Sequence, residues 1–164
     1  MKQLFTIRPA TTSDHDSIWN IFHAVVAPGD TYTIDPDISR EDAFAYWFRD
    51  DTRTYVAEFE NRVVGTYTLR PNRAGGGKHV SNASFMVHPS AQGKGVGRAM
   101  AEHCLSEARR LGYSAMQFNF VVSTNENAVR LWKALGFDIV GTLPGAFRHP
   151  GKGFVDAYVM FREL

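Results

Sequence analysis

A glycine-rich segment near the middle of the chain constrains the fold more than any other feature of the sequence. It reads Gln92-Gly93-Lys94-Gly95-Val96-Gly97-Arg98 and lies between an apolar run that ends at Val87 and an amphipathic helical pattern. Glycines allow a tight turn and bring backbone N–H groups close to a ligand. The first turn of a helix leaves N–H groups without partners at the positive end of its dipole. The segment therefore predicts a strand-to-helix turn that holds a pyrophosphate, with Lys94 and Arg98 adding charge at its rim.

Two other interpretations fit this turn when it is taken alone. A glycine-rich turn can join a strand to a helix without binding a ligand, and dinucleotide-binding folds carry a related glycine pattern. The dinucleotide-binding fold fits the context poorly, because several strands precede the turn and no second strand–helix–strand half follows it.

Alternating and helical patterns predict one α/β domain that spans residues 1–164. Seven strands are expected, at residues 4–8, 54–59, 62–69, 80–87, 113–122, 137–143 and 154–161. Four helices are expected, beginning at Ser13 and Ser39, covering residues 97–111, and running from a cap at Asn125 to about residue 135. This order predicts helices packed around one central mixed sheet.

Local signals give further detail to this outline. Ser13, with Asp16 three residues later, is expected to cap the first helix. The buried stripe of that helix is expected to consist of Ile18, Ile21, Phe22 and Val25. Residues 71–78 are expected to form a mobile loop, and a loop rich in glycine and proline is expected between the last two strands.

Composition excludes several classes of protein. The formal net charge of +1 argues against a nucleic-acid partner, and the largest basic clusters, such as Arg109-Arg110, are expected to be solvated helix surface. The single cysteine, Cys104, cannot form an intrachain disulfide and lies at helical spacing among apolar residues, so we expect a packing thiol. No secretory signal and no apolar run of membrane-spanning length is present. We therefore expect a cytoplasmic enzyme with no membrane partner and no metal site.

A second motif begins at Asn125 and ends at Gly136-Phe137, with Ala128, Leu131 and Trp132 on one helical face. Taken alone, that face is core. Together with the glycine-rich turn, however, it resembles the coenzyme A signatures of the GCN5-related N-acetyltransferase (GNAT) superfamily. The resemblance covers nearly the whole chain. It implies a mostly antiparallel mixed sheet of about seven strands flanked by four helices, with strands four and five splayed.

The resemblance also implies where acetyl-CoA binds. The pantetheine arm is expected to pair with the backbone of Phe85, Met86 and Val87, beside Asn125 and Trp132. The pyrophosphate is expected on the amides of Gly93, Lys94, Gly95, Val96, Gly97 and Arg98. Many members of the family have a tyrosine where this chain has Trp132, and an indole cannot act as an acid. Ser123 or Thr124 is the expected hydrogen-bond donor to the sulfur instead.

The acceptor side of the site lacks an acid in the segment Ser81-Asn82-Ala83-Ser84-Phe85, where many relatives place a carboxylate. An amine has a pKa of ~10, so it needs a base or a site that lowers its pKa. Asn82, Ser84 and Asn119 can orient an amine but cannot deprotonate it. We therefore expect proton loss through water or His79, and we expect a backbone N–H near Phe85 to polarise the acetyl carbonyl.

Residues 80–85 and 119–125 resemble a narrower group, the yeast-type acetyltransferases of azetidine-2-carboxylate. That resemblance implies that Asn82 holds the substrate nitrogen and that Asn119 and Asn125 complete the site. Four basic residues in loops are candidates for binding the substrate carboxylate, or are simply solvated loop charges: Arg73, Lys78, Arg148 and Lys152.

The resulting prediction is an N-acetyltransferase in which a small-molecule amine attacks acetyl-CoA directly in a ternary complex. A protein N-terminus or lysine is the alternative acceptor. A non-catalytic acyl-CoA-binding regulatory domain is the alternative to an enzyme. Because many members of the superfamily dimerise, the resemblance also raises a homodimer.

Overall fold

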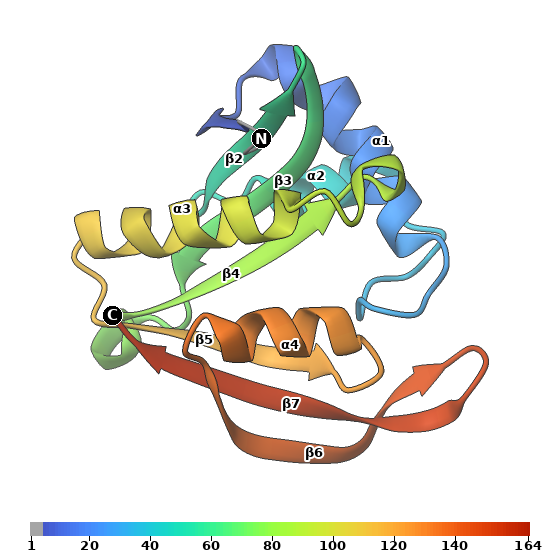
Figure 1. Ribbon diagram of the computed structural model, residues 1–164, viewed down its shortest axis with the longest axis vertical. Coiled ribbons are helices and arrows are strands. Elements are labelled where there is room, and N and C mark those ends of the chain that lie inside the picture. The colour runs from blue at the N-terminus through green and yellow to red at the C-terminus, as the bar shows by residue number, and fades with distance from the viewer. Residues whose placement is uncertain (1–4) are drawn as a thin grey trace.

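A single seven-stranded sheet forms the centre of the computed structural model, which describes residues 5–164 (Figure 1). The strands are β1 (Thr6–Pro9), β2 (Arg53–Phe59), β3 (Arg62–Pro71), β4 (Val80–Val87), β5 (Ala115–Val122), β6 (Asp138–His149) and β7 (Gly153–Glu163). Their order across the sheet is β1-β2-β3-β4-β5-β7-β6. All neighbouring strands are antiparallel except β4 and β5. The expected mixed, mostly antiparallel sheet is thus confirmed.

Four helices cover the two faces of this sheet: α1 (His15–Val26), α2 (Arg40–Trp47), α3 (Val96–Arg110) and α4 (Glu126–Ala134). One core forms where α1 and α2 pack on the sheet, around Phe22, Trp47 and Val56. A larger core forms on the opposite face, where Met100 of α3 and Trp132 of α4 are buried. Burial of these apolar faces is the main force that fixes the helices on the sheet. Among residues 5–164, no helix is long and apolar enough to cross a membrane.

Most expected elements lie where the sequence placed them, and three details were wrong. The first helix is preceded by a 3-10 turn, and its cap is formed by Thr11 and Asp14 rather than by Ser13 and Asp16. In its buried stripe Val26 replaces Val25. The last two strands run on to His149 and from Gly153, so most of the expected loop between them is strand, interrupted by a bulge. Residue 4 of the first expected strand lies outside the described residues.

The corrected cap is part of a charged cluster that joins α1 to the sheet. Asp14 accepts two hydrogen bonds from the Arg8 guanidinium, at 2.8 and 2.9 Å, and a third from the backbone N–H of Thr11 at 2.7 Å. Arg8 also binds Glu58 on β2 at 2.9 Å. The hydrogen bonds from Arg8 lower the pKa of the Asp14 carboxyl to about 2. The Asp14 side chain is only 6% exposed, whereas its partner Arg8 is 33% exposed and Glu58 28%, so Asp14 is the shielded member of the cluster.

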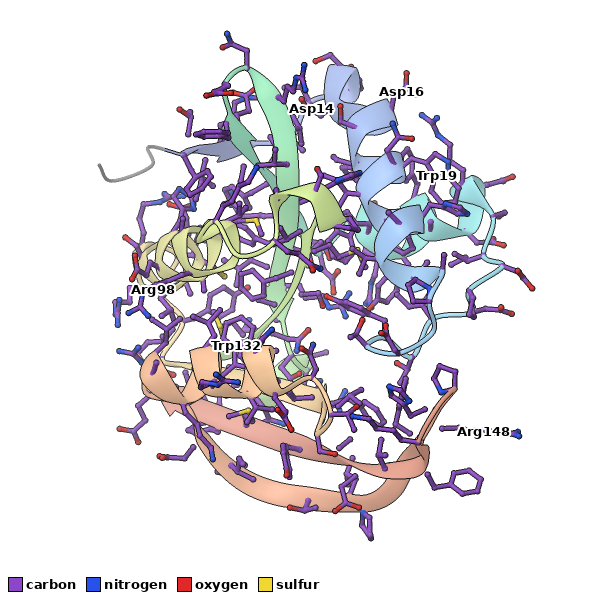
Figure 2. The ribbon with its side chains drawn as sticks, turned by 45° about the vertical axis from the view of Figure 1, so that its right-hand side comes forward. Asp14, Asp16, Trp19, Arg98, Trp132 and Arg148 are labelled. Carbon is purple, nitrogen blue, oxygen red and sulfur yellow. The ribbon has the colours of Figure 1, made fainter. Side chains whose placement is uncertain are left out.

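This pKa predicts acid sensitivity. The folded pKa of Asp14 lies below its unfolded value, so its contribution is complete above pH ~4 and is lost as the pH falls towards 2. Over that range the unfolding free energy of the wild type, measured in urea titrations, should decrease by ~1–2 kcal/mol more than that of Asp14→Asn. Asp16→Asn, which removes a carboxylate that is 86% exposed on the outer side of α1, is the matched control (Figure 2). Parallel curves for D14N and the wild type would contradict the prediction.

Candidate active site

The strands β4 and β5 separate after only two paired positions. Val80 pairs with Ala115 and Ser81 with Met116, and no later residues of the two strands pair. Beyond that point Asn82 makes one more link, because its Nδ2 donates to the Gln117 carbonyl oxygen at 2.9 Å. Figure 1 shows the two strands diverging, with α3 beside β4 and α4 beside β5. We call the space between the diverging strands the wedge.

The register of β3 and β4 shows which backbone groups face the wedge. Asn72 N donates to Val80 O and His88 N donates to Val64 O, so the hydrogen-bonded pairs of this ladder fall on even-numbered residues of β4. In an antiparallel ladder such pairs alternate with pairs whose N–H and C=O groups point the other way. Phe85 and Val87 therefore direct their backbone groups into the wedge. Met86 directs its backbone to β3, so of the three expected pantetheine-binding residues it is the one turned away.

The glycine-rich turn leads from the end of β4 into α3, as expected. Gly95 is the N-terminal cap of α3 in a left-handed conformation (φ 86°), and the first helical hydrogen bond runs from Ala99 N to Gly95 O at 3.0 Å. The amides before Ala99 are therefore without helical partners. A Cβ atom at Gly93 or at Gly95 would meet no protein atom within 4 Å, which leaves open space above these amides. Lys94 is exposed, and the equally exposed Arg98 pairs with Glu102 at 3.0 Å.

Aromatic rings fill the α4 side of the wedge. The ring of Phe85 lies 5.4 Å from Tyr67 on β3 and 5.1 Å from Trp132 on α4. Trp132 continues the series to Phe118 on β5 at 4.5 Å, and Phe118 stacks on Phe137 at the same distance. The rings thus form a column that bridges the two strands where their backbones do not pair. Trp132 is only 8% exposed, and Figure 2 shows it on α4.

A cavity of about 280 Å³ lies in the wedge. Its walls come from both faces of the sheet: residues 31–33, Tyr46 of α2, Arg70 of β3, residues 82–85 of β4, residues 118–122 of β5, and Asn125, Ala128 and Trp132 beside and on α4. A second cavity, of about 460 Å³, shares Arg70, Asn82 and Asn119 with the first. The wedge therefore connects the α4 side of the sheet with the α2 side. No carboxylate or histidine is among the described residues that line the first cavity.

Polar side chains at the base of the wedge are organised by one another. Gln117 Nε2 donates to Asn119 Oδ1 at 2.9 Å, and Asn119 Nδ2 donates to Asn72 Oδ1 at 2.7 Å. Because the Asn82 amide NH₂ is directed to the Gln117 carbonyl, its oxygen points away from that bond. Within residues 5–164, Asn82 Oδ1 takes part in no hydrogen bond, although Asn82 is only 8% exposed.

The chain matches the family described as "Acetyltransferase (GNAT) family" over residues 18–137. The chain belongs to this GNAT family. It is 32% identical over 148 residues to the N-acetyltransferase aca1 of Schizosaccharomyces pombe, covering 80% of this chain and 71% of that protein. It is 29% identical over 143 residues to the L-methionine sulfoximine/L-methionine sulfone acetyltransferase of Salmonella typhimurium, covering 85% of this chain and 83% of that protein.

Solved GNAT structures agree with the assignment. A GCN5-related N-acetyltransferase from Kribbella flavida superposes with a TM-score of 0.94 at 43% identity and covers 98% of both chains. The yncA protein of Salmonella typhimurium, solved with its cofactor acetyl-CoA, superposes with a TM-score of 0.86 at 27% identity and covers 98% of this chain and 94% of its own. This chain is an acetyl-CoA-dependent N-acetyltransferase.

Two features of the wedge fit acetyl-CoA. Open space lies beside Gly93 and Gly95 in the glycine-rich turn, and the Phe85 and Val87 backbones lack a strand partner. A ligand that carries a pyrophosphate and two amides can satisfy such groups. These residues would therefore hold the diphosphate and the pantetheine arm, with Asn125 and Trp132 lining the cavity beside them.

The remaining expected site residues divide into two groups. Asn82 and Asn119 both line the cavity, on opposite sides of the wedge. Ser123, Thr124 and His79 do not line it: the backbone of Ser123 binds Asp156 on β7, and His79 is exposed.

Burial raises the pKa of the Cys104 thiol inside α3, which agrees with a packing role. Arg148, a carboxylate-binding candidate, points away from the protein at the tip of the β6–β7 hairpin (Figure 2).

The cavity residues that sequence reasoning missed include Tyr32, Tyr46 and Arg70. The first lies in the loop between α1 and α2, where no local pattern indicates a site, and its hydroxyl donates a hydrogen bond to the Phe85 carbonyl oxygen. Arg70 continues an even-numbered face of β3 that also carries Thr66 and Thr68. The alternation of β3 combined with the hairpin register would have placed Arg70 beside Asn82.

The open turn predicts that a side chain at Gly95 competes with the diphosphate. Gly95→Ala should weaken coenzyme A binding at least ~10-fold in calorimetry, since its Cβ projects into the space above the amides. Gly112→Ala is the matched control: this glycine also has a left-handed conformation (φ 87°) and open space, but it lies at the other end of α3. Both variants carry similar backbone strain. Equal coenzyme A affinities for the two variants would show that the turn does not hold the diphosphate.

Proposed function

We propose that this enzyme acetylates the amine of a small molecule, with a cyclic imino acid such as azetidine-2-carboxylate as the leading acceptor. The amine attacks the thioester directly while both substrates are bound. Support for a small acceptor comes from the partly enclosed cavity and from the relative named for L-methionine sulfoximine and L-methionine sulfone. Within the chain, the free carboxamide oxygen of Asn82 is the observation that carries the proposal.

Asn82 is suited to hold an attacking nitrogen. Its side chain amide cannot rotate freely, because the NH₂ group is bound to the Gln117 carbonyl oxygen at the vertex of the wedge. The oxygen is then a fixed acceptor on the wall of the cavity. A secondary amine such as azetidine has one N–H in its neutral form. Donating that N–H to Asn82 turns the nitrogen lone pair away from the carboxamide and towards the acetyl group.

Tyr32 supports the other half of the reaction. Its hydroxyl donates to the Phe85 carbonyl oxygen, one of the backbone groups that faces the wedge. Burial raises the pKa of Tyr32, so the phenol keeps its proton and serves as a donor rather than as a base. This contact steadies the β4 backbone at the position where the Phe85 N–H polarises the acetyl carbonyl in the proposed reaction. The thioester supplies its own leaving group, since a thiol with a pKa of ~8.5 departs as thiolate without an acid. The proton of the attacking nitrogen passes to solvent water, because the described residues that line the cavity include no carboxylate and no histidine.

The proposed role of Asn82 predicts a loss of activity when its side chain is removed. Asn82→Ala should lower kcat/KM for L-azetidine-2-carboxylate by about 100-fold, because the nitrogen loses its fixed acceptor, while coenzyme A affinity changes less than about twofold. Asn127→Ala, at an exposed asparagine on α4, is the control for loss of a carboxamide. Thermal melts of both variants separate loss of activity from loss of folding. The role assigned to Asn82 fails if a folded N82A protein retains wild-type kcat/KM.

The residues of the cavity wall predict how kcat/KM depends on pH. Because the described residues that line the cavity include no carboxylate and no histidine, the rate should depend on the fraction of free amine that is neutral in solution. The logarithm of kcat/KM should therefore rise with a slope near 1 from pH 6 towards the amine pKa of ~10. Steady-state kinetics over this range test the idea. A plateau reached below pH 8 would instead reveal a base within the protein.

Acceptor class is tested by measuring release of the coenzyme A thiol from acetyl-CoA with a panel of amines. The panel contains cyclic imino acids, linear amino acids, simple amines, and peptides that present a free N-terminus or a lysine. We expect turnover with the small amino compounds and little with the peptides. Turnover confined to peptides would transfer the proposal to a protein acceptor.

A further inference from the structure

We propose that Arg70 forms a carboxylate-binding subsite that restricts this enzyme to amines carrying an adjacent carboxylate. The inference rests on the proposed function, since it names a second contact for the same acceptor. It assigns this role to a strand residue rather than to any of the four basic loop residues considered from the sequence.

The position of Arg70 follows from the β3–β4 register. Arg70 pairs directly with Asn82, and the hydrogen-bonding alternation makes this a hydrogen-bonded pair, whose Cα atoms lie about 5.5 Å apart. Directly opposed residues of neighbouring strands present their side chains on the same face of the sheet. Arg70 and Asn82 therefore stand side by side on the α2 face, and both line the two cavities that meet at the wedge.

The guanidinium of Arg70 is held in place but not neutralised. Its Cζ lies 5.5 Å from the centre of the Tyr46 ring, a cation–π contact that positions the planar group. None of the ion pairs found within residues 5–164 involves Arg70, and none of the side-chain hydrogen bonds there uses its N–H groups. An arginine that is half-buried, stacked and unpaired presents its donors to whatever fills the cavity.

The other basic residues near the cavities fit this role less well. Arg49 lies in the second cavity but is paired with Asp51 at 3.2 Å. Arg73 and Lys78 are exposed and line only the second cavity, whereas Arg148 and Lys152 line neither. Of the described residues, Arg70 is the only cationic side chain that borders the first cavity, where the Asn82 oxygen is also found.

The two side chains together describe one type of acceptor. Asn82 offers an acceptor for an amine N–H, and the adjacent Arg70 offers the paired donors that match a carboxylate. An α-amino or α-imino acid has its nitrogen and carboxylate on the same carbon, so it can satisfy both neighbours at once. An amine without a carboxylate would leave the Arg70 guanidinium without its counter-ion in the cavity, and such unpaired groups are the strongest source of discrimination.

The experiment compares two acceptors that differ only in the carboxylate, L-azetidine-2-carboxylate and azetidine. We expect Arg70→Met to raise KM for L-azetidine-2-carboxylate roughly 10- to 100-fold, the range for a lost hydrogen-bonded charge pair, with a smaller change in kcat. Its kinetics with azetidine should stay within about twofold of the wild type. Arg70→Lys should recover part of the lost affinity, because it restores the charge without the paired donors. Arg73→Gln, which removes an exposed charge at the rim of the second cavity, is the matched control and should behave as the wild type.

Calorimetry of the same two compounds with the coenzyme A complex separates this inference from the proposed function. Loss of L-azetidine-2-carboxylate binding in R70M, with wild-type folding and coenzyme A affinity, supports the subsite even if the wild type proves to acetylate neither compound. Two results overturn it: equal effects of R70M on both compounds, or a wild-type enzyme that binds and acetylates azetidine as well as the imino acid. In the second case the proposed acetylation of small amines still holds.

Discussion

The early separation of β4 from β5 is the constraint on which the site depends. A sheet normally pairs the N–H and C=O groups of neighbouring strands, and unpaired groups in a protein interior are costly. Here the pairing stops after Ser81 and Met116, so the backbone of Phe85 and Val87 is left to face the wedge. The chain compensates at both ends of the opening. Asn82 closes the vertex by binding the Gln117 carbonyl, and the Tyr32 hydroxyl occupies the Phe85 carbonyl further along.

Neutral amides rather than charges organise the base of the wedge. Gln117, Asn119 and Asn72 form a chain of side-chain hydrogen bonds in which each amide fixes the orientation of the next. The choice of asparagine at position 82 is consistent with its neighbour. An acidic residue there would lie directly opposite Arg70 and would form an ion pair with it. Such a pair would occupy both the acceptor that we propose for the amine and the donors that we propose for a carboxylate.

Much of the fold could be predicted because its strongest signals are local. The glycine-rich turn, the apolar face of α4 and the alternation of β2 and β3 each follow from a few consecutive residues. The errors arose where distant contacts decide the outcome. Asp14 replaces Asp16 in the first cap because Arg8, on a separate strand, holds its carboxylate. The last hairpin runs through Pro144 and Gly145 because a bulge accommodates the extra residues, and the Gly145 N–H is satisfied by Asp156 on the partner strand.

The candidate site shows the same division. The residues expected to hold coenzyme A lie in contiguous motifs, so the sequence alone could name them. The backbone direction of Met86 could not be read in this way, because it depends on the register with β3. Arg70 and Tyr46 were missed because they come together only when β3 and α2 pack on the same face of the sheet.

The aromatic column across the wedge bears on how readily the enzyme accepts its substrates. Rings from β3, β4, β5 and α4 remain in contact where the strand backbones separate, so side-chain packing supports the shape of the opening. A site that is already shaped spends little of its interaction energy on rearrangement or on ordering side chains. The entropy cost of ordering these side chains is thus incurred when the protein folds rather than each time a substrate binds. Most of the interaction energy with the substrates then remains for holding the two reactants in the orientation needed for the reaction.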